Sequence, residues 1–125
     1  MSSTQNPHNN TVAAATLTSG TTGSGVGFSA TSFSAGTKSS GTYTPAASDG
    51  NFQHATNGGA HTLAPPSTVC TIIVEYTNNG SAGTITTSGF TKVSGDAFTT
   101  TNGSKFLCFI TKTQNYSNLN VVALQ

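Results

Sequence analysis

Two stretches with alternating side chains decide the fold of this 125-residue chain: residues 69–77, Val-Cys-Thr-Ile-Ile-Val-Glu-Tyr-Thr, and residues 105–112, Lys-Phe-Leu-Cys-Phe-Ile-Thr-Lys. Successive side chains of a strand point to opposite faces, so every second residue from 70 to 76 shares one apolar face. Phe106, Cys108 and Ile110 do the same in the second stretch. Because the opposite faces are also largely apolar, both stretches are predicted to be central strands covered on both sides.

Turn signals separate further short apolar stretches along the chain. Asn-Gly occurs at Asn57-Gly58, Asn79-Gly80 and Asn102-Gly103, and this dipeptide is favoured in two-residue type I′ hairpins. Nine strands are expected, at residues 41–45, 51–56, 60–64, 69–77, 83–87, 89–93, 96–100, 105–112 and 119–124. Short strands at this spacing predict an all-β fold: a jelly-roll-like β-sandwich or a barrel of short antiparallel strands, with an extended N-terminal arm.

The apolar residues of the second half are expected to form a modest core. They include Phe52, Leu63, Val69, Ile72, Ile73, Val74, Ile85, Phe90, Val93, Phe98, Phe106, Leu107, Phe109, Ile110, Leu119, Val121, Val122 and Leu124. A domain of this size buries only ~60% of its unfolded surface, so oligomerisation would add burial.

The N-terminal part of the chain has low complexity. Across residues 11–50, 31 of 40 positions are Ser, Thr, Gly or Ala, and such small side chains bury too little area to offset the entropy of ordering the backbone. We therefore expect a Ser/Thr/Gly/Ala-rich arm at residues 1–40 and a β domain at residues 41–125. Two interpretations of the arm stay open: a flexible tail, or an arm that becomes ordered only against another subunit. In the second case Val26, Phe28 and Phe33 are the expected interface anchors.

Charge is scarce: four Lys, no Arg and three acidic residues make 6% of the chain, against roughly a quarter in typical domains. Four scattered lysines do not form the basic face that nucleic-acid binding requires. The apolar runs are only a few residues long, whereas a membrane span needs ~20, and no secretory signal is visible at the N-terminus. Neither nucleic acid nor a membrane is an expected partner.

Groups suited to catalysis or metal binding are equally scarce. His54 and His61 are expected to face each other across a hairpin, but no further ligand follows at a spacing that would complete a zinc site. Asp49, Glu75 and Asp96 are isolated in the sequence, so no pair of carboxylates is predicted to face one pocket. We expect no enzyme activity, no cofactor and no metal.

The cysteines and tyrosines allow two further expectations. Cys70 and Cys108 each lie in an apolar row, which favours buried free thiols, with a cross-strand disulfide as the alternative. Trp is absent, so recognition of sugars would depend on Tyr43, Tyr76 and Tyr116.

Several turn-and-strand motifs in the second half resemble those of a known family. The motifs lie at residues 41–45 (Gly-Thr-Tyr-Thr-Pro), 50–53, 56–66, 88–90, 95–106 and 122–125 (Val-Ala-Leu-Gln). Together they resemble small virion structural proteins and fibre-like modules of tailed bacteriophages. The resemblance covers about residues 41–125 and includes no catalytic signature.

The resemblance implies a role in assembly. Proteins of this kind decorate or cement a capsid, or form part of head or tail fibres, usually as trimers. We therefore expect a non-enzymatic capsid decoration (cement) protein, a homotrimer bound to the major capsid protein on the virion and assembled in the bacterial host cytoplasm. Unpaired cysteines suit that reducing compartment. The alternative is a head- or tail-fibre or adhesin module that contacts host-surface glycans.

Overall fold

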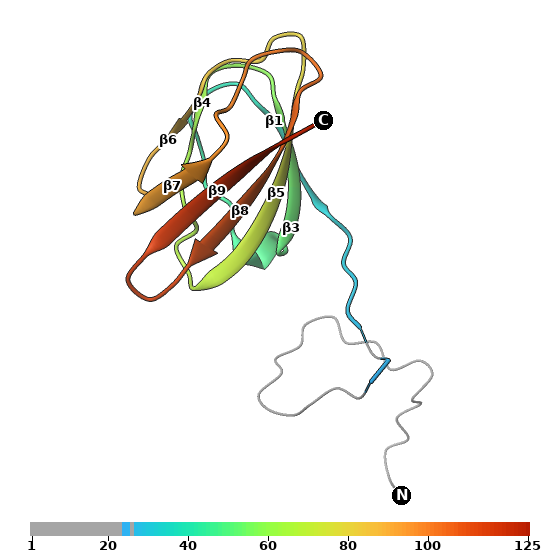
Figure 1. The fold of residues 1–125 in the computed structure, drawn as a ribbon, viewed down its shortest axis with the longest axis vertical. Coiled ribbons are helices and arrows are strands. Elements are labelled where there is room, and N and C mark those ends of the chain that lie inside the picture. Colours follow the sequence, from blue (N-terminus) through green and yellow to red (C-terminus); the bar gives the residue numbers. More distant parts are fainter. Residues whose placement is uncertain (1–23, 26) are drawn as a thin grey trace, which may run out of the picture.

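The computed structural model describes residues 24–25 and 27–125. Within them the fold is all-β, as the sequence predicts, and contains no α-helix (Figure 1). Six strands form one mixed sheet, in the order β1-β3-β5-β8-β9-β7, and three form a small sheet, in the order β2-β4-β6. The elements are β1 (Phe33–Lys38), β2 (Thr42–Tyr43), the 3-10 turn η1 (Ala47–Asp49), β3 (Phe52–Asn57), β4 (His61–Leu63), β5 (Cys70–Asn78), β6 (Ile85–Thr87), β7 (Lys92–Gly95), β8 (Lys105–Lys112) and β9 (Ser117–Leu124).

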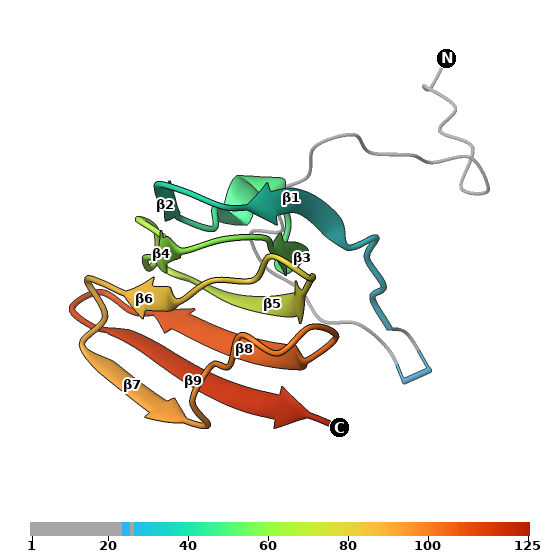
Figure 2. The same ribbon diagram turned by 90° about the horizontal axis from the view of Figure 1, so that it is seen from above.

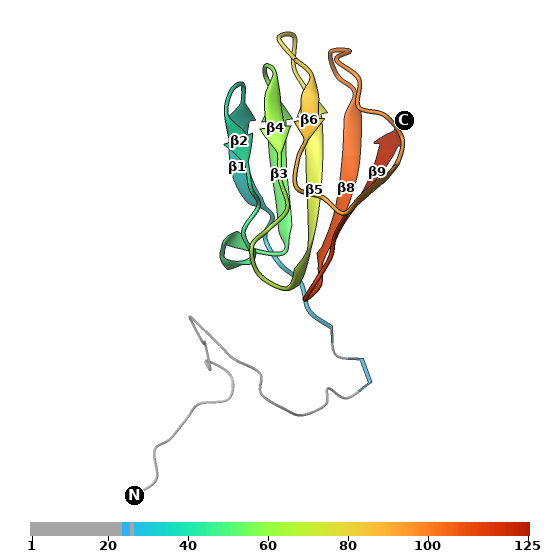
Figure 3. The same cartoon turned by 90° about the vertical axis from the view of Figure 1, so that its left-hand side faces the viewer.

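The first six strands form three stacked pairs, which we call rungs. Rung 1 is β1 with β2, rung 2 is β3 with β4, and rung 3 is β5 with β6, so each rung contributes one strand to each sheet. All neighbouring strands in this stack are parallel, and Figure 3 shows the small sheet lying over the large one. Threonines 19 to 24 residues apart occupy equivalent places: Thr37, Thr56 and Thr77 in the large sheet, and Thr42, Thr62 and Thr86 in the small one.

This parallel stack corrects the expectation of short antiparallel strands joined at Asn-Gly hairpins. The turns at Asn57-Gly58 and Asn79-Gly80 carry the chain from the large sheet to the small sheet within a rung. No described non-glycine residue has a positive φ, so neither Asn adopts the conformation that a type I′ turn requires. The third dipeptide, Asn102-Gly103, lies between β7 and β8, which are not neighbours in the sheet.

Buried amide groups join rungs 2 and 3 at the corner where these turns lie. Asn57 and Asn78 are paired in register and buried. Asn57 Nδ2 donates to Asn78 Oδ1 at 3.0 Å and to the Gly83 carbonyl at 2.8 Å. Asn78 Nδ2 donates to the carbonyls of Thr99 and Thr101, at 2.7 and 3.0 Å. The corner therefore satisfies its buried polar groups, which would otherwise destabilise it.

Gly83 allows the two rungs to approach at this corner. A Cβ atom at Gly83 would overlap the backbone nitrogen of Ala60 in rung 2. The Gly83 N–H also donates to Asn57 Oδ1, at 3.1 Å. Close backbone contact thus requires glycine at this position.

The C-terminal part extends the large sheet with antiparallel strands. β8 pairs antiparallel with both β5 and β9, while β7 pairs in parallel with β9 at the far edge. Figures 1 and 2 show β7 on the same side of the molecule as β6. The strand predicted at residues 105–112 is confirmed as β8, and the one at 69–77 as β5, one residue later. Residues 96–100 form no strand.

The core lies between the two sheets. Its buried apolar residues are Tyr43, Ala55, Leu63, Ile72, Val74, Tyr76, Ile85, Phe106, Cys108, Ile110, Leu119 and Val121. Aromatic rings form a connected row through it: the ring centroids are 6.3 Å apart in Tyr43–Tyr76, 5.9 Å in Tyr76–Phe98 and 5.3 Å in Phe98–Phe106, all in edge-to-face geometry. Such pairs add stabilisation beyond the area they bury.

β1 lies inside the stretch that was predicted to be the arm. Its residues pair in parallel with β3, with a register shift between Ser34 and Thr37 where Gly36 has φ 78°. The sheet therefore begins at residue 33 and not near residue 41. Composition hides this strand because backbone hydrogen bonds to β3, not large buried side chains, hold it in place.

Candidate interaction surface

The large sheet presents an apolar outer face, on the side away from the small sheet. Phe52, Ile73 and Phe109 lie side by side in register across β3, β5 and β8. Leu107 and Val122 form a second row across β8 and β9. Cross-strand neighbours of this kind lie in side-chain contact. We call this patch the outer surface; its residues are Phe52, Ile73, Leu107, Phe109, Val122 and Leu124.

The outer surface corrects the expectation that both faces of the central strands are covered. Phe52 is 49% exposed, Phe109 38% and Leu124 37%, and Ile73, Leu107 and Val122 are half-buried. The small sheet packs on one face of the large sheet only, and no described element covers the other. Six of the 18 apolar residues expected in the core thus lie on the outer surface, and Val69 and Val93 are also exposed, at 69% and 44%. Apolar side chains that remain accessible mark interaction sites when they are contiguous.

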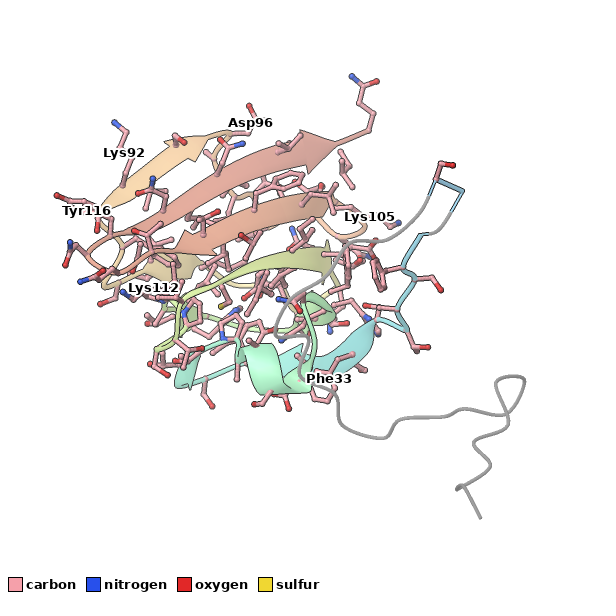
Figure 4. The ribbon with its side chains drawn as sticks, turned by 90° about the horizontal axis from the view of Figure 1, so that it is seen from below. Phe33, Lys92, Asp96, Lys105, Lys112 and Tyr116 are labelled. Carbon is pink, nitrogen blue, oxygen red and sulfur yellow. The ribbon has the colours of Figure 1, made fainter. Side chains whose placement is uncertain are left out.

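Polar groups lie among and beside these apolar rows. His54 of β3 and Glu75 of β5 pair in register next to Leu107, and Lys105 pairs with Leu124 at one end. Figure 4 places Lys105 and Lys112 toward opposite ends of β8, with Lys92 and Asp96 along the β7 edge. An apolar centre with a polar rim is the usual composition of a protein–protein interface.

The three arm residues predicted as interface anchors do not form one site in the structure. Val26 lies outside the described residues. Phe28 belongs to no strand and is 84% exposed. Phe33 begins β1, in register with the buried Gln53, and is 40% exposed. Phe33 therefore sits at the open end of the core and not on the outer surface, and the structure does not bring it together with Phe28.

The two histidines expected to face each other are separated. His54 lies on the outer side of β3, where its Nδ1 and Ser32 Oγ share a hydrogen bond of 2.7 Å. His61 is buried on the inner side of β4: its Nδ1 is bonded to the Gly59 carbonyl at 2.9 Å and its Nε2 to Tyr76 Oη at 3.1 Å. The hairpin expectation is wrong because the chain changes sheets between the two residues.

Two of the three tyrosines are core residues. Tyr43 Oη donates to the buried Gln53 Oε1 at 2.6 Å, and Lys38 Nζ lies 4.7 Å from the Tyr43 ring centroid. Burial raises the pKa of Tyr43, with smaller contributions from Asp49 and Cys108. Burial also raises the pKa of Tyr76, with smaller contributions from Cys108 and Tyr43. Only Tyr116, in the β8–β9 turn, is largely exposed, at 60%.

The cysteines are both free thiols, as one of the two expectations states. Cys108 is fully buried, and this burial raises the pKa of its thiol to about 12. Cys70 is half-buried and its Sγ donates to the Thr68 carbonyl at 3.3 Å. Cys108 thus acts as a small apolar core residue.

The three acidic residues, Asp49, Glu75 and Asp96, are exposed to solvent, and Asp96 also has a structural hydrogen bond. Asp96 Oδ2 accepts a hydrogen bond from the Ala123 backbone N–H at 2.9 Å, joining the end of β7 to β9. Within residues 24–25 and 27–125, no group of three potential metal ligands comes together. The same residues include no helix with the length and hydropathy of a membrane span.

Sequence reasoning assigned the outer-surface residues to the core, although a signal of their position was present. On the outer side of β5, Thr71, Glu75 and Thr77 surround Ile73, whereas the inner side carries apolar residues from 70 to 76. On the outer side of β8, Lys105 and Thr111 flank the two apolar residues. This polar admixture indicates the less buried face of each strand. Comparison of the chain with protein-family models, with curated proteins and with solved structures found no match.

Proposed function

We propose that this chain is a non-enzymatic structural protein of a tailed-bacteriophage particle. In this proposal it is a capsid decoration (cement) protein: a homotrimer that binds the major capsid protein on the outside of the shell and stabilises the virion. The two facing sheets would act as a small rigid β-sandwich that holds the binding surface in shape.

The outer surface is the observation that carries this proposal. It places three side chains exposed by more than a third, together with three half-buried ones, across four adjacent strands of one sheet. Covering apolar area stabilises an assembly by about 25 cal/mol per Å². A broad patch on rigid strands requires little reordering on binding, which keeps the entropic cost of association low.

The low charge of the chain supports the same role. Only four Lys and three acidic residues are present in 125 positions. A protein that remains unattached usually carries charge to limit association, whereas charges at a permanent interface must be desolvated at a cost. Residues on the outer surface and beside it are mostly apolar side chains, hydroxyls and amides, which suit attachment to another protein.

The proposal is tested by replacing outer-surface residues and measuring attachment to capsids assembled without this protein. Phe109→Ser and Phe52→Ser are expected to weaken binding at least tenfold, since buried aromatic anchors dominate interface energies. Co-sedimentation measures binding, and circular dichroism checks that the fold is retained. Tyr116→Ser is the matched control: it removes an exposed aromatic outside the outer surface and should bind as the wild type does.

Two results would contradict the proposal. Unchanged attachment of folded Phe109→Ser and Phe52→Ser proteins would show that this surface does not bind the shell. A handful of copies per particle, in place of hundreds, would exclude decoration and favour a fibre.

The adhesin alternative has its own test. Binding of the isolated protein to host glycans, lost in Tyr116→Ser, would favour it. Tyr43 and Tyr76 are too buried to serve as platforms for a sugar.

A further inference from the structure

The three-rung stack has an open end at rung 1. β1 is the last strand of the large sheet and β2 the last of the small sheet, so in the described part of the chain each has one edge without a partner strand. Figure 2 shows both strands at the same end of the molecule. The exposed backbone groups of such edges are templates for a further strand.

Side chains at this end also leave the core uncovered. A hollow of about 400 Å³ opens between the two edge strands. It is lined by Phe33, Ala35, Lys38, Tyr43 and Asp49, among others, and Phe33 stays 40% exposed although it is in register with buried Gln53 of the next rung. In rungs 2 and 3 the adjacent rung covers the equivalent inward positions. Rung 1 therefore lacks the layer that its neighbours possess.

The sequence contains a segment with the pattern of a rung. Residues 12–22, Val-Ala-Ala-Ala-Thr-Leu-Thr-Ser-Gly-Thr-Thr, align with residues 33–43, Phe-Ser-Ala-Gly-Thr-Lys-Ser-Ser-Gly-Thr-Tyr, at a separation of 21 residues. Five of the 11 positions are identical, and Val12 aligns with Phe33. The identical pairs are Ala14/Ala35, Thr16/Thr37, Ser19/Ser40, Gly20/Gly41 and Thr21/Thr42. The separation lies within the 19 to 24 residues that relate the described rungs.

We infer that residues 12–22 of a second copy of this chain add to the edges of β1 and β2 as a further parallel rung. Val12 and Ala14 would then cover the hollow beside Phe33 and Ala35, and Thr21 would extend the row formed by Thr42, Thr62 and Thr86. This is strand addition at a sheet edge, in which main-chain hydrogen bonds supply affinity and the inward side chains supply register.

The path of the chain before β1 favours a second copy over the same molecule. Ser32 bonds to His54 on the outer side of the large sheet, and Figures 2 and 3 show residues 27–32 running away from β2. A rung from the same chain would require these residues to cross from the small sheet to β1, as residues 44–51 do between β2 and β3. Exchange of an identical segment between copies avoids that crossing and produces an oligomer.

Paired cysteines test the predicted register in the isolated, full-length protein. Thr21→Cys and Thr42→Cys would lie on neighbouring parallel strands, about 4.8 Å apart, within the range for a disulfide. In a Cys70→Ser background, we mix a chain carrying only Thr21→Cys with a chain carrying only Thr42→Cys and oxidise with diamide. A disulfide-linked dimer is expected on a non-reducing gel. The matched control replaces Thr42→Cys with Thr86→Cys, which lies on the same face two strands further away, and should cross-link at least tenfold less.

Three results would overturn the inference. Equal cross-linking of the two mixtures would show that no register exists. Absence of cross-linking in both would show that residues 12–22 do not reach β2. A double variant, Thr21→Cys with Thr42→Cys, that forms its disulfide only within one chain would assign the added rung to the same molecule. As a second measurement, deletion of residues 1–23 is expected to convert the oligomer to a folded monomer in sedimentation velocity. None of these experiments involves the capsid, so their outcome is separate from that of the proposed attachment.

Discussion

The rung stack and the antiparallel part of the large sheet bury different kinds of side chain. Four of the five buried polar residues, Gln53, Asn57, His61 and Asn78, belong to the rungs. β8 and β9 instead bury Phe106, Cys108, Ile110, Leu119 and Val121. The rungs also contain seven of the twelve core residues. They therefore combine apolar burial with satisfied amide hydrogen bonds at their corners, whereas β8 and β9 depend mainly on apolar burial.

The largest expected effect comes from the antiparallel strands. Phe106→Ala removes a ring that is 1% exposed and packs 5.3 Å from Phe98, and should lower the free energy of unfolding by about 3–5 kcal/mol. Urea denaturation monitored by circular dichroism measures the loss. Phe109→Ala, on the opposite face of the same strand and 38% exposed, is the control and should lose less than half as much. Equal losses would show that the two faces of β8 are equally buried in solution.

A smaller loss is expected when the buried amide of rung 2 is removed. Asn57→Ala deletes the donors to Asn78 and Gly83 and the acceptor for the Gly83 N–H. Leaving such groups without partners costs about 2–3 kcal/mol in the free energy of unfolding. Asn118→Ala, at an exposed position of β9, is the control and should change stability by less than about 0.5 kcal/mol. If the two variants behave alike, the corner amides do not stabilise the rungs.

Alkaline pH should weaken the core at Cys108. The pKa of this thiol is raised to about 12 by burial, so between about pH 9 and 12 the unfolded chain releases a proton that the folded chain retains. Stability is then full below pH 9 and falls as the pH rises, by at most about 1.4 kcal/mol per pH unit for this group. Denaturation from pH 8 to 11 should show a shallower decline in Cys108→Ala than in the wild type. Identical slopes would mean that the thiol ionises in the folded protein.

The smallest expected effect lies at the edge of the antiparallel part. Asp96→Ala removes the acceptor for the Ala123 N–H and should cost about 0.5–1 kcal/mol. Hydrogen exchange is the sensitive measurement, because the Ala123 amide should exchange faster while amides in β5 stay protected. Unchanged exchange at Ala123 would show that β7 is held by its strand pairing alone.

The candidate site was only partly predictable. The sequence pattern predicts that every residue of the outer surface lies in the core. The alternation of side chains along a strand shows which residues share a face, but it does not show which face another layer covers. The arm anchors are the large apolar residues of a low-complexity stretch, and nothing in that pattern shows that Phe33 is an inward residue at the end of the stack. Composition marks the threonine- and glycine-rich stretches as low complexity, and only the paired registers show that the threonines recur once in each rung.

By itself, the sequence determined the all-β class, the position of β8 and nearly that of β5, and it favoured free thiols over a disulfide. Those features follow from side-chain alternation and composition, which are local. The tertiary structure decided that β1–β6 are parallel, that Asn57 and Asn79 turn between sheets, and that one face of the large sheet stays open. These depend on pairing between residues some 20 positions apart and on the number of layers the chain can supply, which no local pattern specifies.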